Sequence, residues 1–369
     1  MCCNKKCCLI VGSVVGGLLA ILGGVLFPEA VIEDGTIAYE NWIVPGSPVY
    51  RYFWIFHVLN PDEVLKGGIP NLEQKGPYVY LVRHVPKSNV TQNNNNTVSF
   101  YQPNEAIFQP IMSIGPEEDT YTVLNLAVAY NGTSDGPYTV YNGKEDINTV
   151  ALITKYKGES TLSYWKNDYC DMINGTDAAS FPPFVDKNKL LYFFSSEICR
   201  SIYGEFRKEY MLKGIKLYRF VVPSSALASP TVNPDNYCYC TDTVLSRNCT
   251  AAGVLDLRVC QGGKPIFLSL PHFLHGSDFL LTQVNGLSPN EEEHQTFVDV
   301  EPITGFTMHF AKRLQVNTAL IGKESADRFK SSVTVPMKVL EVVQILLLCL
   351  GGVLFFACSI TLCVIRGKK

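Results

Sequence analysis

The stretch FVDVEPITGFTMHFAKRLQV, residues 297–316, decides the fold class. Both of its halves are rich in β-branched and aromatic residues, and Pro302, Ile303, Thr304 and Gly305 lie between them. Proline and glycine at such a junction are typical of a turn, so the stretch predicts two antiparallel strands joined as a hairpin.

The sequence outward from this hairpin also favours strands. Further β-branched and aromatic runs, each bounded by turn residues, predict strands over residues 49–58, 76–85, 96–103, 120–130, 214–222 and 265–270. The dipeptides Asp135-Gly136 and Asn142-Gly143 flank the run PYTVY and predict turns of a hairpin meander.

Helices are expected to be few. Asn60 followed by Pro61 predicts the start of a short helix, and Gly67-Gly68 predicts its end. Residues 187–211 are predicted to form the longest helix. Its apolar positions recur at helical spacing at Leu191, Phe194, Ile198, Ile202 and Phe206. The expected class is therefore mainly β with short helices, an α+β fold in a single outer domain.

Two uncharged apolar runs lie near the chain ends. The first, Leu9–Phe27, has 19 residues, which is longer than the apolar part of a signal peptide and close to the length that crosses a bilayer. A retained anchor is favoured there over a cleaved signal peptide. The second, Val342–Ile365, has 24 residues, and we assign 339–365 to the second membrane helix.

The flanking charges predict the topology. Lys5 and Lys6 precede the first run, and three basic residues follow the second, which places tails 1–8 and 366–369 in the cytoplasm and residues 28–338 outside. The whole chain has a net charge of −3, and with those five basic residues assigned to the tails the outer part is more acidic still. This acidity argues against a nucleic-acid partner.

Six cysteines fall within the outer part, at Cys170, Cys199, Cys238, Cys240, Cys249 and Cys260. An even number in an oxidising compartment predicts three disulfides, with 15 pairings possible from the sequence alone. Disulfides are favoured over a zinc site built from the last four of these cysteines. Glycosylation acceptors also lie only in this part, at Asn89, Asn95, Asn131, Asn174 and Asn248.

The cysteines near the cytoplasmic ends predict S-palmitoylation, with free thiols as the alternative. The candidates are Cys2, Cys3, Cys7, Cys8 and Cys363. We find no motif of a known catalytic class and expect neither an enzyme nor a cofactor. A metal site at His272 and His275, completed by His294 or His309, is a weak alternative.

Long segments resemble the class B scavenger receptors, the CD36 family. These are EDGTIAYENW, FWIFHVLNPDEV, KGPYVYLVR, NTVSFYQPNEAIF, YCDMINGTDAASFPPFV, SSEICRSIY, NPDNYCYCT, SPNEEEHQTF and DVEPITGFTMHFAKRLQVN. The resemblance covers nearly the whole chain. It implies a large, irregular antiparallel β-barrel-like ectodomain with an apolar tunnel, and disulfides Cys170–Cys238, Cys199–Cys260 and Cys240–Cys249.

The resemblance also implies a function. The expected protein is a two-pass plasma-membrane receptor, in caveolae or lipid rafts, that binds oxidised lipoproteins, phospholipids and long-chain fatty acids and helps fatty acids enter the cell. Co-receptors and thrombospondin are implied as partners, and cell adhesion as a further role. Candidate tunnel residues are Phe181, Phe184, Phe193 and Phe194, with ordinary core packing as the alternative.

The chain departs from the family pattern inside the outer part. After Ala127–Ala129 it lacks a helical segment that carries the family's lipid-associated lysine, and near Asn317 it lacks a strand-like segment. The counterpart of the family's acidic thrombospondin region, residues 80–106, is mostly neutral, which weakens the expectation of thrombospondin binding. The rival hypothesis is an adhesion or structural glycoprotein with the same scaffold and impaired lipid binding.

Overall fold

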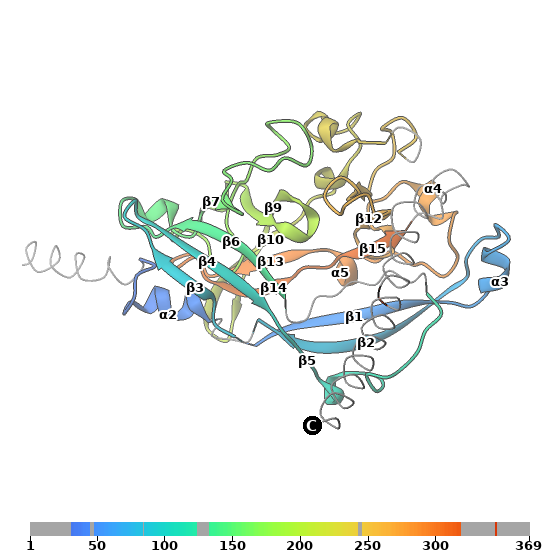
Figure 1. The fold of residues 1–369 in the computed structure, drawn as a ribbon, viewed down its shortest axis with the longest axis horizontal. Helices are drawn as coiled ribbons and strands as arrows, with labels where there is room; N and C mark the ends of the chain where they lie inside the picture. Colours follow the sequence, from blue (N-terminus) through green and yellow to red (C-terminus); the bar gives the residue numbers. More distant parts are fainter. Residues whose placement is uncertain are drawn as a thin grey trace, which may run out of the picture. The chain divides into compact units, whose positions relative to one another are not determined.

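The computed structural model describes residues 31–44, 48–83, 85–123, 133–242 and 246–318, together with Gln344. Residues 1–317 belong to one compact unit, and a second unit begins at Thr318. The strands of the described residues form four sheets, and the helices there are short (Figure 1). The predicted class, mainly β with short helices, is confirmed.

The largest sheet has five strands in the order β14-β13-β10-β9-β8. Its strands are β8 (Leu191–Ser195), β9 (Arg200–Leu212), β10 (Ile215–Val221), β13 (Phe297–Val300) and β14 (Thr307–Ala311). The predicted hairpin is confirmed, because β13 pairs antiparallel with β14 from Phe297 opposite Ala311. The sheet thus joins two distant chain segments, green and orange in Figure 1.

The helix predicted over residues 187–211 is wrong. Strands β8 and β9 occupy this segment, connected by the 3-10 turn η4 (Ser196–Ile198). The reason lies in the spacing of the apolar residues: Ile202 and Phe206 are four apart, and positions four apart share a face in a strand as well as in a helix. Cys199 has a left-handed backbone (φ 56°), which ends the turn and reverses the chain.

Two further sheets come from the first half of the chain. One has the order β1-β2-β5, and the other has the order β3-β4-β6-β7. The strands are β1 (Val49–Val58), β2 (Leu72–Val82), β3 (Ser88–Gln92), β4 (Thr97–Asn104), β5 (Ala106–Phe108), β6 (Thr133–Tyr141) and β7 (Ile153–Tyr156). The strand predicted over 49–58 is present with those ends, and the strands predicted over 76–85 and 96–103 are present with shifted ends.

Two other predictions in this half differ from the structure. Asp135 and Gly136 lie within β6 rather than in a turn, where the pairing with β4 shifts register between Phe100 and Gln102. Residues 120–123, the described part of the strand predicted over 120–130, have no regular secondary structure. The remainder of that prediction lies outside the described residues.

The fourth sheet has the order β11-β12-β15. It contains β11 (Leu255–Asp256), β12 (Ile266–Ser269) and β15 (Gln315–Thr318). The helices are α2 (Ile37–Ile43), α3 (Pro61–Val64), α4 (Asp278–Leu281), α5 (Glu291–His294), η2 (Pro110–Met112), η3 (Ile147–Thr149), η5 (Ser224–Leu227), η6 (Pro234–Tyr239) and η7 (Pro271–Phe273). No helix among the described residues is long and apolar enough to cross a membrane, and both predicted spans lie outside those residues except for Gln344.

Many of the buried apolar residues in the described part of the chain fall into two clusters. One surrounds the five-stranded sheet and includes Phe181, Phe193 and Phe220 together with Cys170 and Cys199. The other is centred on β4, β6 and β7, with Val98, Phe100, Val140 and Tyr156 among its members. The disulfides thus attach the loops after β10 to the first cluster, where burial of apolar area supplies most of the stabilisation.

Candidate functional site

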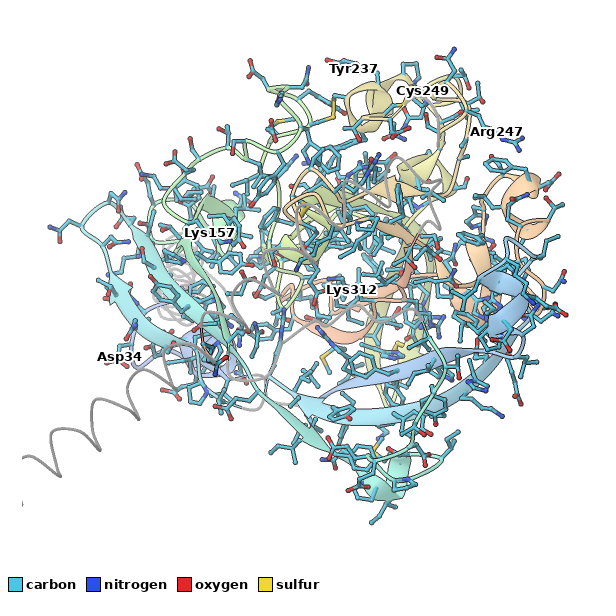
Figure 2. The ribbon with its side chains drawn as sticks, turned by 45° about the vertical axis from the view of Figure 1, so that its right-hand side comes forward. Asp34, Lys157, Tyr237, Arg247, Cys249 and Lys312 are labelled. Carbon is cyan, nitrogen blue, oxygen red and sulfur yellow. A yellow bond between two sulfur atoms is a disulfide. The ribbon has the colours of Figure 1, made fainter. Side chains whose placement is uncertain are left out.

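Two disulfides attach the segment between β10 and β12 to residues that precede β9, and a third closes a loop within the segment. They join Cys170 to Cys238, Cys199 to Cys260 and Cys240 to Cys249. This is the pairing that the resemblance implies. Tyr237, Arg247 and Cys249, labelled in Figure 2, belong to this segment.

A cavity of about 90 Å³ lies beneath this disulfide-linked segment. Apolar side chains make up most of its wall, including Leu227, Pro230, Val254, Leu255, Phe267 and Leu280. The strand β9 contributes Arg200, and η6 contributes Tyr239. The volume exceeds the roughly 10–15 Å³ that one water needs, so the space admits a small organic group.

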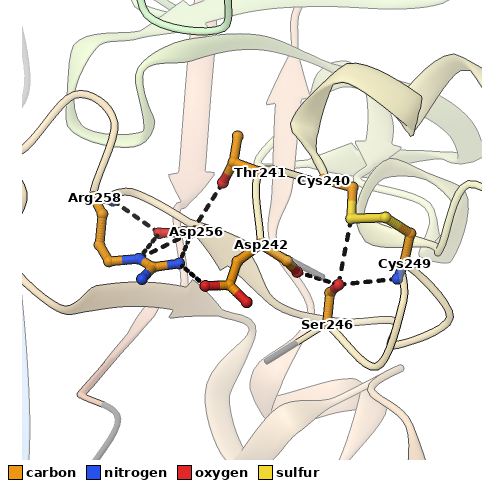
Figure 3. Close-up of polar contacts among 7 residues, drawn as sticks. All are labelled: Cys240, Thr241, Asp242, Ser246, Cys249, Asp256 and Arg258. Carbon is orange, nitrogen blue, oxygen red and sulfur yellow. Dashed lines mark hydrogen bonds and ion pairs between the residues drawn. A yellow bond between two sulfur atoms is a disulfide. The ribbon is translucent and has the colours of Figure 1, made fainter. Parts of the chain in front are cut away.

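Two carboxylates of the cavity wall share one arginine, so the cluster of Asp242, Asp256 and Arg258 keeps one net negative charge. Arg258 Nη2 donates to Asp256 Oδ2 at 2.6 Å and to Asp242 Oδ2 at 2.7 Å, as Figure 3 shows. Thr241 Oγ1 also donates to Asp256, at 2.9 Å. These hydrogen bonds, with burial opposing them, raise the pKa of Arg258 above its usual range. The acidic side of the cavity is therefore fully engaged.

The same loop holds the Cys240–Cys249 disulfide in place. Ser246 Oγ accepts a hydrogen bond from the Cys249 backbone N–H at 2.9 Å and donates to the backbone oxygen of Asp242 (Figure 3). These bonds connect the disulfide directly to the residue that meets Arg258. This part of the cavity wall is therefore joined both by a disulfide and by hydrogen bonds.

Arg200 lies on another wall of the cavity and is only 5% exposed. Its guanidinium carbon lies 3.5 Å from the centre of the Tyr239 ring, in a cation–π contact. Its Nε donates to Ser201 O at 3.2 Å, and its Nη1 donates to Ala226 O at 3.4 Å. Burial lowers the pKa of Arg200, because the charged form loses its water.

The histidines considered as metal ligands adopt another arrangement. The rings of His272 and His294 stack with centroids 4.3 Å apart. The Nδ1 atom of His272 accepts from the Ser288 N–H at 3.0 Å, and its Nε2 lies 2.6 Å from Gln74 Oε1. His275 instead lies 3.2 Å from Glu291, and His309 lies near Asp299. Among the described residues, no group of three potential ligands is placed to hold a metal.

Comparison with known proteins identifies the family. The CD36 family model matches residues 6–129 and 126–325. The chain belongs to the CD36 family. Lysosome membrane protein 2 from Rattus norvegicus is 30% identical over 431 aligned positions, which cover 92% of this chain and 88% of the relative. The protein of the same name from Homo sapiens is 31% identical, over 78% of this chain and 73% of the relative.

A receptor of the CD36 family gives a similar match. Scavenger receptor class B member 1 from Sus scrofa is 28% identical over 450 aligned positions, which cover 93% of this chain and 87% of the relative. The alignments over 431 and 450 positions are longer than the 369 residues of the chain, so these two relatives contain residues without a counterpart here. The two matched segments of the family model meet at residues 126–129.

The predicted tunnel residues of this CD36-family chain are not brought together. Phe181 and Phe193 are buried in the cluster around the large sheet, whereas Phe194 is buried in the other cluster. Phe184 is 67% exposed on the surface. None of the four lines the cavity of about 90 Å³.

The predicted modification sites differ in their positions. Asn89, Asn95 and Asn248 are exposed, and Asn174 is partly buried. Asn131 lies outside the described residues, as do all candidate palmitoylation cysteines: Cys2, Cys3, Cys7, Cys8 and Cys363.

Sequence reasoning missed the charged residues of the cavity. Asp256 and Arg258 are two positions apart, so the sequence alone shows that they are near each other. The contact of Arg258 with Asp242 depends on the conformation of the loop. Arg200 directly follows Cys199 and lies in the segment that was predicted to be a helix, whereas the structure places it at the start of β9. Nothing in the sequence indicated that its guanidinium would be buried.

Proposed function

We propose that this CD36-family protein is a membrane receptor that binds lipoproteins and lipids. The observation that carries the proposal is the family match over most of the chain, together with a relative named as a scavenger receptor. Three disulfides in the described domain suit an extracellular or luminal location. The proposed site of action is the plasma membrane, with two spans and both tails in the cytoplasm.

The finer function that we propose is uptake of long-chain fatty acids from the outer medium. Removal of each methylene group from water is favourable by about 0.8 kcal/mol, so a path enclosed by apolar side chains lets an acyl chain move without exposure. Phe181, Phe193 and Phe194 are buried and remain candidates for such a tunnel. Oxidised lipoproteins and phospholipids are the proposed larger ligands, and catalysis plays no part in the mechanism.

Ligand uptake by intact cells tests this proposal. Cells that express the full chain should take up a fluorescent fatty acid saturably, and unlabelled oleate should compete. They should also bind labelled oxidised lipoprotein. Cells with equal surface expression of an unrelated two-pass glycoprotein are the control, and uptake equal to that control would refute the receptor function.

The membrane topology needs a separate test. With both tails inside, protease added to whole cells should degrade the disulfide-bonded domain, and endoglycosidase should increase its electrophoretic mobility. Protection of that domain from protease, with no mobility change, would contradict the proposed placement. After hydroxylamine has removed any thioester-linked acyl chains, reagents directed at thiols should reach the tail cysteines only in permeabilised cells.

A second function is favoured by the family residues that the chain lacks. The relatives contain residues without a counterpart here, and one junction lies at residues 126–129. An adhesion or structural glycoprotein on the same scaffold would fold and reach the surface yet bind no lipid. The uptake experiment distinguishes this alternative, provided that surface expression and thermal stability are measured alongside.

A further inference from the structure

Arg200 is a buried cation without an anionic partner among the described residues. Its two hydrogen bonds go to the carbonyl oxygens of Ser201 and Ala226, at 3.2 and 3.4 Å. A guanidinium carries five N–H donors, so three of them have no acceptor within the described parts of the chain. Burial of a charge is costly unless an opposite charge or a set of hydrogen bonds compensates.

The other ionic groups of the cavity do not supply that partner. Asp242 and Asp256 each accept hydrogen bonds from Arg258 at 2.6–3.0 Å. Asp256 is further engaged by Thr241 and by the Arg258 backbone N–H. A positively charged ligand would therefore have to displace Arg258, whereas a negative ligand finds free donors on Arg200.

The remaining wall defines the rest of the ligand. Leucine, proline, valine and phenylalanine side chains line the space, and they favour an aliphatic body beside the charged group. A cavity of about 90 Å³ is smaller than the roughly 150 Å³ cavity that admits benzene. Because the cavity is open to solvent on one side, it admits a carboxylate and the first few carbons of a chain, and the rest of that chain would extend outward.

We propose that the Arg200 cavity binds the carboxylate and first few carbons of an aliphatic monocarboxylic acid. The Arg200 guanidinium donates hydrogen bonds to the carboxylate, and the apolar wall packs against the chain. The acid is either a short free acid or the head of a longer fatty acid. This site deepens the lipid-binding function proposed above and rests on it for the class of ligand.

Isothermal titration of the purified full chain in lipid nanodiscs with hexanoate tests the site. The wild type should bind hexanoate and should not bind hexanamide, which has the same chain without the charge. Arg200→Met should weaken hexanoate binding by roughly tenfold or more, since a charge-assisted hydrogen bond is lost. Arg200→Lys, which keeps the charge, should retain part of the affinity.

Arg207→Met is the matched control. Arg207 lies on the same strand β9 but is exposed, so its replacement removes the same charge and should leave hexanoate binding unchanged. Equal binding by the wild type and Arg200→Met would overturn the proposal, as would equal loss in both variants. Equal binding of hexanoate and hexanamide to the wild type would also overturn it, whether or not Arg200→Met folds.

Longer acids and cell uptake separate this site from the receptor function. If the long acid enters head-first, oleate binding should also fall in Arg200→Met; if only short acids enter, oleate binding should stay unchanged while hexanoate binding is lost. Hexanoate binding that depends on Arg200 without any lipoprotein or fatty-acid uptake would refute the receptor function alone. Uptake without hexanoate binding would refute the cavity site alone.

Discussion

At the scale of single residues, Asp299 shows how one buried charge organises the large sheet. It is fully buried on β13 and accepts from Arg219 of β10 at 2.6 and 2.7 Å and from Tyr210 of β9 at 2.7 Å. Replacement of Asp299 by alanine leaves Arg219 without its buried partner. We expect Asp299→Ala to lower the free energy of unfolding by about 3–5 kcal/mol.

Chemical unfolding of the purified full chain, followed by fluorescence, measures this change. Glu209→Ala is the control, because Glu209 pairs with Lys187 and Lys216 on the surface and should matter little. If Asp299→Ala were as stable as Glu209→Ala, the buried ion pair would not hold the three strands together.

Gly175 illustrates a backbone requirement at one position. Its φ is +89°, and a Cβ there would lie 2.0 Å from the backbone oxygen of Tyr192. Since that atom belongs to β8, Gly175→Ala should cost about 3 kcal/mol or more and reduce surface expression. Gly158→Ala is matched in φ, at +86°, but has no atom within 4 Å, so thermal melting should show a much smaller loss. Similar losses in both variants would assign the effect to φ alone.

At the scale of elements, the sequence predicts strands well where turn residues and strand composition agree. The β13–β14 hairpin satisfies both, since Pro302 and Gly305 separate two runs rich in β-branched and aromatic residues. The apolar pattern of residues 187–211 is compatible with a helix and with a strand, because residues four positions apart lie on the same face in both. The αL turn at Cys199 depends on the tertiary fold, including the disulfide to Cys260, which local periodicity does not contain.

The disulfides differ in the length of chain that they close. Cys170–Cys238 spans a separation of 68 residues, whereas Cys240–Cys249 spans 9. In the chain-entropy account, loss of the longer crosslink costs about 4 kcal/mol and loss of the shorter one about 3 kcal/mol. We therefore expect the double variant Cys170→Ala/Cys238→Ala to melt at a lower temperature than Cys240→Ala/Cys249→Ala. The reverse order would indicate that strain or packing, rather than loop closure, dominates.

At the scale of the whole molecule, sequence patterns indicated a membrane-anchored, disulfide-bonded domain, but not its cavity. The apolar composition of the chain ends and the even number of cysteines can be read from the sequence without knowing which residues are in contact. The cavity instead requires Arg200 of β9, Tyr239 of η6 and Phe267 of β12 to meet, and these residues are up to 67 positions apart. Only the packing of the disulfide-linked segment on the large sheet brings them together.

The stacked histidines predict how the whole fold responds to acid. His272 lies between Gln74 of β2, Gln315 of β15 and the ring of His294, so its environment depends on several elements. Burial lowers the pKa of His272, and the neighbouring His294 lowers it further, while Glu293 opposes this effect. Burial likewise lowers the pKa of His294, with Glu293 opposing the change and Arg313 adding to it.

Because both pKa values lie below the ordinary value of 6.5, the unfolded chain takes up protons first as the pH falls. The stabilisation is complete above about pH 6.5 and is lost as the pH passes down through the folded-state values. Each tenfold difference in proton affinity between the folded and unfolded chain corresponds to about 1.4 kcal/mol.

The double variant His272→Asn/His294→Asn keeps an acceptor near each Nδ1 and should lose less stability between about pH 7.5 and about pH 5. Thermal melting at both pH values measures the difference, with His309→Asn, an exposed histidine on β14, as the control. A pH profile of the double variant that matches the wild type would show that other groups cause the acid sensitivity.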